Sequence, residues 1–588
     1  MIFNNRLKSL KEEKEQLQRK VDNYTRYRIF VVALAIGSGF IGGFNLLELL
    51  LFFILFLFLV FVHSNLKKSL AKKQHMLDSC QRFLDRQSGK WHDFSFSKPI
   101  FLDKNGDEID EEEALANHPY AKDLDIVGKN SLFQFIDETN TFYGRHMLTH
   151  VLTEETDFVT AKQRQKSVAE IADKKEFCEE LKATGKISEN IANPKDIISY
   201  MQDSKDFLGV FKFASCLPIL LIVTALMYFF LPSNFLLVIA IGILFFQTII
   251  FFLTISKTAP VLSMFYSFNR GLKSFEGLFN LIEKEKFDSD LNKTMQGFLA
   301  NGQNKASRFL KTLYILESAT TFRRSAVLLL VLNIMFLYDI QILVALDKLR
   351  GKDNNLETWL RTVGFFEAMV SIATIPMTFP DWSTPEFNSV QNDLKIKVEN
   401  MGHPLLHEPV KNNYLHKNIS IITGSNMSGK TTFLRSIGVN LVLAYAGSTV
   451  CATSFKIPFV SIYTSMRISD SVTENISTFY AELKRIKIII DRARKNQPMM
   501  FLIDEIFRGT NSEDRIEGAK RVLTQLNKSH IIGFITTHDL EVARDTNFEN
   551  YNFKEYYEDN QIYFDYHIRE GISETKNASY LMKMVGIN

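Results

Sequence analysis

The feature that most constrains this chain is a glycine-rich segment set between an apolar run and a second, partly apolar one. Residues 424–432 read Gly-Ser-Asn-Met-Ser-Gly-Lys-Thr-Thr, which fits the pattern G-x-x-x-x-G-K-[ST]. Residues 419–422 predict a buried strand before it, and residues 432–437 predict a helix after it. There, successive backbone N–H groups can wrap a phosphate at the positive end of a helix dipole. A chance glycine-rich turn is the alternative, and the motifs downstream argue against it.

The pattern predicts a nucleotide site with ATP and Mg²⁺ as its cofactors. Lys430 is expected to reach the β- and γ-phosphates, and the Thr431 hydroxyl is expected to hold Mg²⁺. The predicted nucleotide-binding residues are Gly424, Ser425, Asn426, Met427, Ser428, Gly429, Lys430, Thr431 and Thr432.

Two further apolar runs end in polar residues. Residues 499–503 lead into Asp504 and Glu505, and residues 532–535 lead toward His538. We expect Asp504 to bind Mg²⁺, directly or through water, and Glu505 to orient or deprotonate an attacking water. His538 is a candidate sensor of the γ-phosphate, although a single histidine is more often structural. Glu505, His538 and Lys430 are the predicted catalytic residues.

These motifs, taken in order, resemble the ATPase domain of MutS-type mismatch-repair proteins, which belong to the wider ABC class of ATPases. The motifs that carry the resemblance are Gly424–Thr432, Ser477-Thr478-Phe479 with Glu482, Asp504-Glu505-Ile506 with Arg508-Gly509-Thr510, and Thr537-His538. The likeness covers about residues 400–588, and a weaker likeness covers about 130–205 and 257–400. It implies an ATP hydrolase with a C-terminal α/β P-loop domain.

The resemblance also implies a homodimer with composite sites, in which Ser477 of one subunit would face the phosphates bound by the other. Some positions depart from the family pattern. Phe507 stands where glycine is usual, and Asp539 stands where an aromatic residue is usual. Val410 falls near the expected position of an adenine-stacking aromatic, for which Tyr414 is a candidate substitute. None of these departures removes an expected phosphate or metal ligand, so hydrolysis remains the expectation.

Two long apolar stretches predict membrane hairpins. The first gives helices at about 27–44 and 46–63, and the second gives helices at about 210–230 and 235–255. Each stretch has few or no charged residues over lengths that approach the thickness of a hydrocarbon core. Pairs of buried core helices are the alternative, but soluble helices of such length usually keep a polar face.

The distribution of basic residues predicts an orientation. Lysines and arginines flank both hairpins, and the hairpin turns have none. By the positive-inside rule, both termini and the ATPase domain are expected in the cytoplasm, in an integral protein of a bacterial-type inner membrane. The net charge of +3 gives no strong argument for or against nucleic acid.

The predicted fold is multidomain: an N-terminal transmembrane hairpin, an all-α core and lever interrupted by a second transmembrane hairpin, and the C-terminal ATPase domain. The predicted boundaries are 1–75 for an N-terminal helix with the first hairpin, 76–205 for a linker and first core part, 206–256 for the second hairpin, 257–400 for the core and lever, and 401–588 for the ATPase domain. Within the core, the apolar run 325–338 is interpreted as a buried helix because it is short for a span and contains Asn333.

The predicted function is that of a membrane-anchored MutS-like ATPase whose cycle changes the shape of a dimer. The mismatch-reading domain of the family is not recognisable, and the second hairpin falls roughly where the family has its DNA clamp. The hypothesis includes DNA binding, in a role like mismatch repair or DNA-damage sensing. DNA and an unidentified protein are therefore candidate partners in addition to the bilayer. Lys484, Arg485, Lys487, Arg492, Arg494 and Lys495 are candidates for phosphate contacts, or simply solvated helix faces. The alternative function is an ABC-type ATPase coupled to transport or to a membrane partner without DNA.

Overall fold

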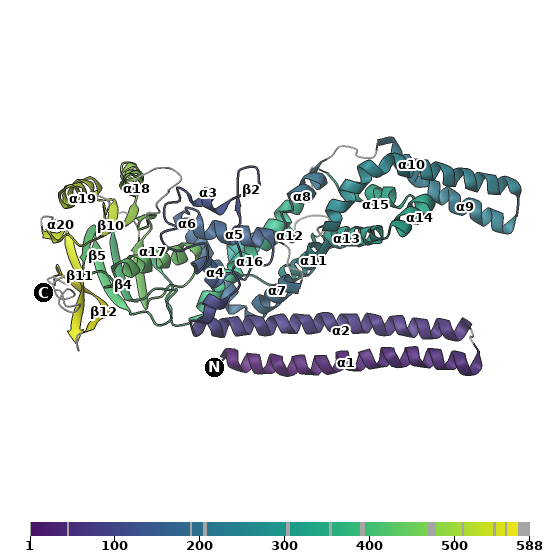
Figure 1. Cartoon of the computed structure of the whole chain (residues 1–588), viewed down its shortest axis with the longest axis horizontal. Coiled ribbons are helices and arrows are strands. Elements are labelled where there is room, and N and C mark those ends of the chain that lie inside the picture. The colour runs from purple at the N-terminus through teal and green to yellow at the C-terminus, as the bar shows by residue number, and fades with distance from the viewer. Residues whose placement is uncertain are drawn as a thin grey trace.

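The computed structural model is an elongated molecule, with an α/β domain at one end and two helical hairpins that extend toward the other (Figure 1). A helical core lies between them. The multidomain arrangement expected from the sequence, a helical N-terminal region followed by a C-terminal α/β domain, is confirmed. The structure describes residues 2–43, 46–187, 191–203, 209–267, 269–300, 306–351, 355–388, 394–467, 478–508, 511–544, 548–558 and 561–573.

The first hairpin consists of two long helices, α1 (Ile2–Gly42) and α2 (Leu46–Gln87). The region predicted as a separate cytoplasmic helix and the predicted span at 27–44 are one continuous helix, and α2 continues well beyond residue 63. The predicted boundary at residue 75 therefore falls inside α2. Away from the turn, Leu10 of α1 is buried beside Cys80 of α2, and the Glu13 carboxylate pairs with Lys73 at 2.6 Å.

Several described helices are long and apolar enough to cross a membrane. They include α2, the 20-residue segment Phe211–Phe230 that ends with α9 (Leu217–Phe230), α10 (Asn234–Ser267) and α16 (Leu356–Thr378). Helices α9 and α10 form the second hairpin. The described part of α1 is not among them. The apolar window of α16 is 89% buried inside the protein, whereas those of α2, α9 and α10 are at most 17% buried. Helix α16 is therefore a buried helix of the core. The hairpin helices, in contrast, present their apolar side chains outward.

The core is built around α16. Its Phe366 ring stacks on Phe287 at 5.0 Å, and its Glu367 carboxylate accepts hydrogen bonds from the backbone N–H groups of Asn140 and Thr141, before α5. The other short elements of the core are η1 (Lys90–Asp93), β1 (Phe101–Leu102), β2 (Glu108–Ile109), α3 (Glu111–Leu115), α4 (Leu132–Ile136), α5 (Phe142–Thr153), α6 (Phe158–Asp173), α7 (Lys175–Ile187), α8 (Lys195–Gln202), α11 (Asn269–Lys284), α12 (Asp290–Ala300) and α13 (Ala306–Ala319).

The second hairpin is preceded by η2 (Gly209–Cys216), and α10 continues to Ser267, so the predicted boundary at residue 256 falls inside this helix. After α13, η3 (Thr320–Arg324) leads into α14 (Ala326–Phe336) and α15 (Tyr338–Asp347). The interpretation of 325–338 as a buried core helix is wrong. In α14 Val327 is 73% exposed, and among its described side chains it is Asn333 that is buried. An apolar composition alone does not distinguish a buried core helix from one whose apolar side chains are exposed.

The C-terminal domain contains two sheets. The six-stranded sheet has the order β12-β11-β6-β10-β9-β8, and all its strands are parallel except β12. The four-stranded sheet has the order β3-β7-β4-β5. The strands are β3 (Glu386–Asn388), β4 (Lys395–Met401), β5 (Asn412–Lys417), β6 (Ile419–Thr423), β7 (Ser454–Pro458), β8 (Ser461–Ser465), β9 (Met499–Asp504), β10 (Ile531–Thr537), β11 (Glu549–Glu558) and β12 (Gln561–Glu570). Because β3 and β4 belong to this domain, it begins before the predicted residue 401.

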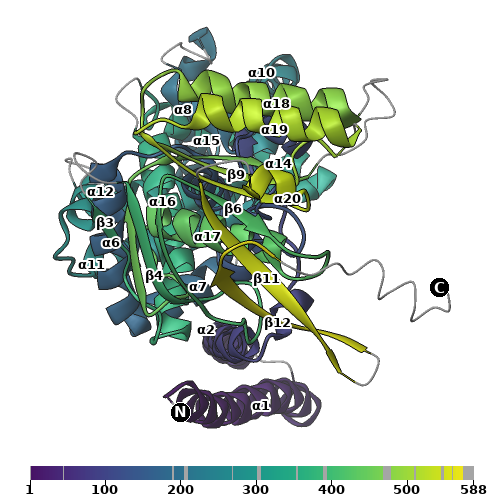
Figure 2. The same cartoon turned by 90° about the vertical axis from the view of Figure 1, so that its left-hand side faces the viewer.

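Helices cover both faces of the larger sheet. Helix α17 (Lys430–Ala446) packs on the face that includes Met500 and Leu502, whereas α18 (Thr478–Ala493), α19 (Ser512–Leu526) and α20 (Leu540–Arg544) cover the face that includes Phe501 and Ile503 (Figure 2). Strand β9 is thus buried on both sides, as its continuous apolar sequence predicts. The carboxyl ends of β6, β9 and β10 meet at one edge, where α/β proteins bind ligands.

A buried charge cluster joins α2 to the core. The Arg86 guanidinium, with no exposed side-chain area, contacts the Glu138 carboxylate at 2.6 Å and donates to the carbonyl of Phe135. Lys182 of α7 is also buried near Glu138. Although burial alone would raise the pKa of Glu138, the charges of Arg82, Arg86 and Lys182 lower it to about 2.

We expect Glu138→Gln to destabilise the protein by about 3 kcal/mol, because buried Arg86 and Lys182 lose their counter-charge. The native carboxyl has a pKa near 2 against an ordinary 4.5, so its contribution is complete above 4.5 and is lost as pH falls toward 2. Denaturant unfolding in detergent across this range should show a shallower pH slope for the variant. Glu180→Gln, at the exposed pair with Lys72, is the matched control and should change little. Equal effects of the two changes would contradict this role of the cluster.

Candidate nucleotide site

The phosphate loop lies between β6 and α17, as the sequence pattern predicted. Its backbone needs glycine at two positions. Gly424 has φ +149°, and a Cβ atom there would lie 2.8 Å from the carbonyl oxygen of Phe553. Gly429 has φ +104° and is followed at once by the first residue of α17. The Ser428 hydroxyl is buried and has no hydrogen-bond partner among the described residues, so it is free to meet a phosphate oxygen.

A cavity of about 580 Å³ opens over this loop. Of the predicted nucleotide-binding residues, those that line it are Asn426, Met427, Ser428, Gly429, Lys430, Thr431 and Thr432. Gly424 and Ser425 lie outside the lining, and the Ser425 hydroxyl donates to Glu555 at 2.8 Å. Ser477 lies outside the described residues.

Lys430 is folded back onto its own loop. Its Nζ donates to the carbonyl oxygens of Gly424 at 3.0 Å and Ser425 at 2.8 Å. Burial lowers the pKa of Lys430, while the nearby carboxylates of Glu505 and Asp504 oppose that shift. An ammonium held by two carbonyl groups can exchange them for phosphate oxygens with little loss of hydrogen bonding.

Asp504 and Thr431 form the candidate metal position. The Thr431 hydroxyl donates to Asp504 Oδ2 at 2.8 Å, and the Thr536 hydroxyl donates to Oδ1 at 2.5 Å. A hydroxyl and a carboxylate side by side at the phosphate loop fit Mg²⁺, which prefers oxygen ligands and commonly uses few from the protein. Bound there, Mg²⁺ would supply positive charge beside the phosphates. The sequence did not predict the role of Thr536 in fixing Asp504, because that role depends on the parallel pairing of β9 with β10.

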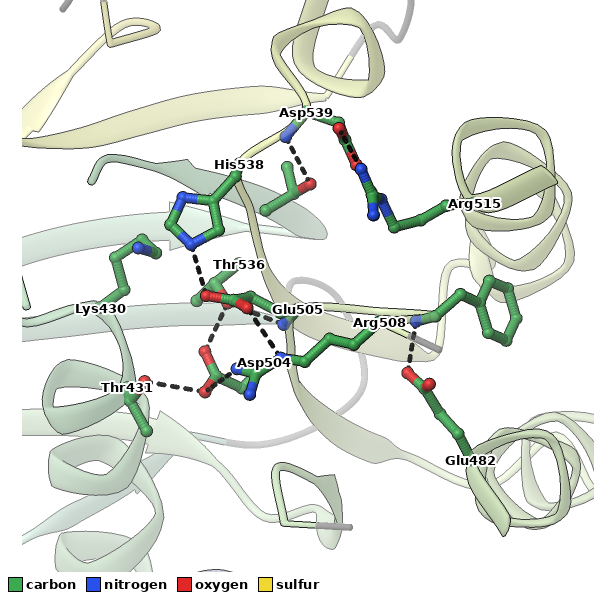
Figure 3. Close-up of polar contacts among 12 residues, drawn as sticks. Lys430, Thr431, Glu482, Asp504, Glu505, Arg508, Arg515, Thr536, His538 and Asp539 are labelled. Atoms are coloured by element: carbon green, nitrogen blue, oxygen red, sulfur yellow. Dashed lines mark hydrogen bonds and ion pairs between the residues drawn. The ribbon is translucent and has the colours of Figure 1, made fainter. Parts of the chain in front are cut away.

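Glu505 lines the cavity between two basic groups (Figure 3). Its Oε1 lies 2.5 Å from His538 Nε2, and its Oε2 lies 2.7 Å from Arg508 Nε. Its backbone has φ +55°, and its N–H donates to Thr536. Burial opposes ionisation, but His538, Arg508 and Lys430 together lower the pKa of Glu505. The carboxylate is therefore ionised at neutral pH and is placed to accept a proton from water.

Two residues that depart from the family pattern, Phe507 and Asp539, lie just after the ends of β9 and β10. Phe507 has φ +62°, a left-handed conformation that glycine adopts without strain, and its N–H is held by the Glu482 carboxylate. Asp539, immediately after His538, forms an ion pair with Arg515 of α19. Both contacts fasten the ends of β9 and β10 to the helices beside them.

Phe433, Phe553 and Tyr566 are the aromatic residues that line the cavity, and Tyr414, the candidate from the sequence, is not among them. Tyr414 is buried beneath the loop, where its hydroxyl donates to Ser420 and its ring contacts Phe433, so it does not line the cavity. Val410 does line it, together with Tyr566 of β12. Tyr566 lies close enough that a Cβ on Gly429 would be 3.0 Å from its ring. No local pattern links Tyr566 to the loop, and the sheet brings them together.

This geometry defines a P-loop ATPase domain: a phosphate loop at the start of a helix, with an acidic pair and a histidine at the adjacent strand ends. Residues 420–587 match the family model for MutS domain V. The C-terminal part of the chain is therefore a MutS-type ATPase domain.

Curated relatives are similar over the same part. The chain is 34% identical over 236 residues to MutS protein homolog 4 from Mus musculus, which covers 37% of this chain and 24% of the relative. It is 29% identical over 222 residues to DNA mismatch repair protein MutS from Aquifex pyrophilus (35% and 25%) and 28% identical over 213 residues to endonuclease MutS2 from Streptococcus mutans (34% and 26%). The chain thus spans about a quarter of the length of these relatives.

Glu505→Gln should keep ATP binding and lower kcat by about 100-fold or more, because the amide cannot accept the water proton. Lys430→Ala should instead abolish tight binding, since it removes the cation from the phosphate loop. Steady-state hydrolysis and binding of a fluorescent ATP analogue separate the two effects. Normal turnover by Glu505→Gln would mean that another group activates the water.

Tyr566→Ala should raise the Kd for ATP about tenfold, because stacking of an aromatic side chain on a base is worth about 1–3 kcal/mol. Tyr563→Ala is the matched control. Tyr563 lies on the same strand and stacks on Tyr556, away from the cavity lining. If both changes weaken ATP binding equally, the loss reflects the strand rather than contact with the nucleotide.

Proposed function

We propose that this protein is a membrane-anchored ATPase of the MutS type, which hydrolyses ATP at the loop 424–432 and uses the cycle to move the helices attached to the domain. The proposed membrane anchoring rests on the exposure of apolar side chains along both hairpins. Phe229 of α9 is 77% exposed and Phe61 of α2 is 66% exposed. Helices that present such side chains to water would aggregate, whereas a hydrocarbon core accepts them.

Both hairpins extend away from the core in the same general direction (Figure 1). On the core side, Arg6 of α1 pairs with Glu179 of α7 at 2.8 Å, so the start of α1 lies beside the core. A single bilayer at the hairpin tips leaves the core, the ATPase domain and the described N-terminal end on one side. We assign that side to the cytoplasm, from the basic residues that flank the hairpins.

We further propose that two copies complete each other's nucleotide sites, with Ser477 acting on the partner's phosphates. The support is the attachment of α18, which begins directly after Ser477. Its Phe479 ring packs on Phe507 at 5.8 Å, and its Glu482 holds the N–H of Phe507, two residues after Glu505. A movement of this segment on meeting a partner's phosphate would reach the loop beside the catalytic carboxylate. ATP binding and dimer geometry would then be coupled.

A DNA partner is supported by the similarity to proteins named for DNA mismatch repair and by the shared ATPase domain. The basic residues considered for phosphate contacts give it less support. Arg485 donates to the carbonyl oxygens of Thr464 and His118, and Arg492 contacts Glu155 at 2.8 Å. These two arginines are engaged within the protein. The second candidate function, an ATPase that acts on a membrane partner without DNA, is favoured by the placement of both hairpins.

The deciding experiment is ATP hydrolysis by the full chain in lipid nanodiscs, with and without duplex, mismatched or branched DNA, at two salt concentrations. We expect basal hydrolysis that Lys430→Ala abolishes. Stimulation by DNA that weakens with salt would support a DNA-directed function, because phosphate contacts release counterions. A rate that ignores every DNA would reject it and favour the membrane partner. Extraction of the protein from membranes by alkaline carbonate would overturn the anchoring itself.

A further inference from the structure

We infer that α14 is a re-entrant membrane segment, which enters the acyl region of the bilayer beside α9 and α10 and leaves on the side from which it came. This inference rests on the proposed membrane anchoring. It assigns a lipid-facing role to a helix that neither hairpin includes. Figure 1 places α14 next to α10, at the end of the core farther from the ATPase domain.

The surface of α14 is apolar and exposed. Its eleven residues contain no charged side chain, and Val327, Leu330, Val331 and Met335 are each more than two-fifths exposed. This surface continues the exposed apolar surface of the adjoining hairpin, so the same hydrocarbon that covers α10 would cover α14. Eleven helical residues rise about 16 Å, roughly half of a hydrocarbon core, so α14 cannot cross alone.

The helix ends in a sharp break. The axes of α14 and α15 differ by 73°, and Leu337 between them has φ +47°. The backbone groups at this break are satisfied inside the protein. The Asn333 carbonyl oxygen accepts from the N–H of Leu337, and its side-chain oxygen accepts from the N–H of Asp339 at 3.0 Å. Broken helices at membrane depth require such internal partners.

A buried glutamine of α10 holds the end of α14. Gln247 has no exposed area, and in the orientation that its neighbours require, its amide donates to the carbonyl oxygens of Ile334 at 2.5 Å and Met335 at 3.2 Å. Both carbonyl groups belong to the last turn of α14, which lacks partners within its own helix. The polar contact therefore lies between α10 and α14, and the apolar side chains are left to face outward.

An ion pair ties the two ends of the segment together. Arg323, before α14, contacts the buried Asp339 carboxylate, after it. The Tyr338 hydroxyl also donates to the carbonyl oxygen of Ala319 at 3.0 Å. The chain that enters α14 and the chain that leaves it are thus within reach of one side chain, so they cannot lie on opposite faces of a bilayer.

The packing of α7 against α16 also requires the chain to leave the bilayer on the side from which α14 entered it. Helix α7 precedes the second hairpin, and α16 follows α15. Phe177 of α7 and Phe366 of α16 lie against each other, with ring centroids 6.3 Å apart. One extra crossing by α14 and α15 would place these packed helices on opposite sides of the membrane. A segment that returns keeps the core whole.

Tryptophan quenching tests the contact with lipid. Val327→Trp and Val331→Trp are compared in nanodiscs of phosphatidylcholine with and without brominated acyl chains. Ile219→Trp, exposed on α9, is the control within the proposed hairpin, and Val159→Trp, exposed on α6, is the control on the core. The unchanged protein gives the background of its own tryptophans, and retained ATPase activity shows that each variant is folded.

We expect the two α14 variants to lose fluorescence to an extent comparable with Ile219→Trp, and Val159→Trp to lose none. If Ile219→Trp is quenched and neither α14 variant is, the re-entrant segment is overturned and the anchoring stands. Absence of quenching at all four positions would overturn the anchoring and this inference with it.

Sidedness is tested with an impermeant maleimide on cells before and after permeabilisation, in a Cys216→Ser background. Lys286→Cys precedes α14 and Lys348→Cys follows α15, and both positions are exposed. We expect both to react only after permeabilisation. Labelling of the two from opposite sides would show a crossing span and overturn the inference.

Discussion

The rest of the structure depends on the buried contact between Arg86 and Glu138, because α2 is fixed to the core there. An arginine removed from water needs a carboxylate with good geometry, and this pair has one at 2.6 Å. One residue further, the Gln87 amide donates to the carbonyl oxygen of Thr378, the last residue of α16. The end of the proposed membrane helix and the end of the central core helix are therefore joined within two residues.

The same junction reaches the nucleotide site. Gly89 has φ +73°, and a Cβ there would lie 2.7 Å from the Cβ of His407. His407 belongs to the loop that leads into β5. Leu406, Glu408 and Pro409 of this loop line the nucleotide cavity on one side and a second cavity, beside Arg86 and Trp91, on the other. A nucleotide that favours one position of the loop must also favour one arrangement of the helix end packed against it, since ligands shift states by differential contact.

The sequence was most informative where chemistry is local. The phosphate loop is one contiguous segment, and apolar strands that end in Asp504 and His538 predict the shared edge because parallel strands align their carboxyl ends. Tyr566 could not be predicted, since its position depends on where the hairpin of β11 and β12 folds. Tyr414 had the expected residue type near the expected place but points into the core. For α14, the same apolar sequence describes a buried helix and one with exposed apolar side chains, and tertiary contacts decide between them.

The distance between the two ends of the molecule limits how they can communicate. Helix α2 has 42 residues, so it extends about 63 Å from the turn of the first hairpin to the core junction. No small molecule bound at the phosphate loop can touch the bilayer across that length. A continuous helix anchored by a buried ion pair can transmit rotation or tilt, because its hydrogen bonds resist local unwinding. An ATPase cycle of the proposed kind would therefore act on the membrane through the angle of α2 rather than through direct contact.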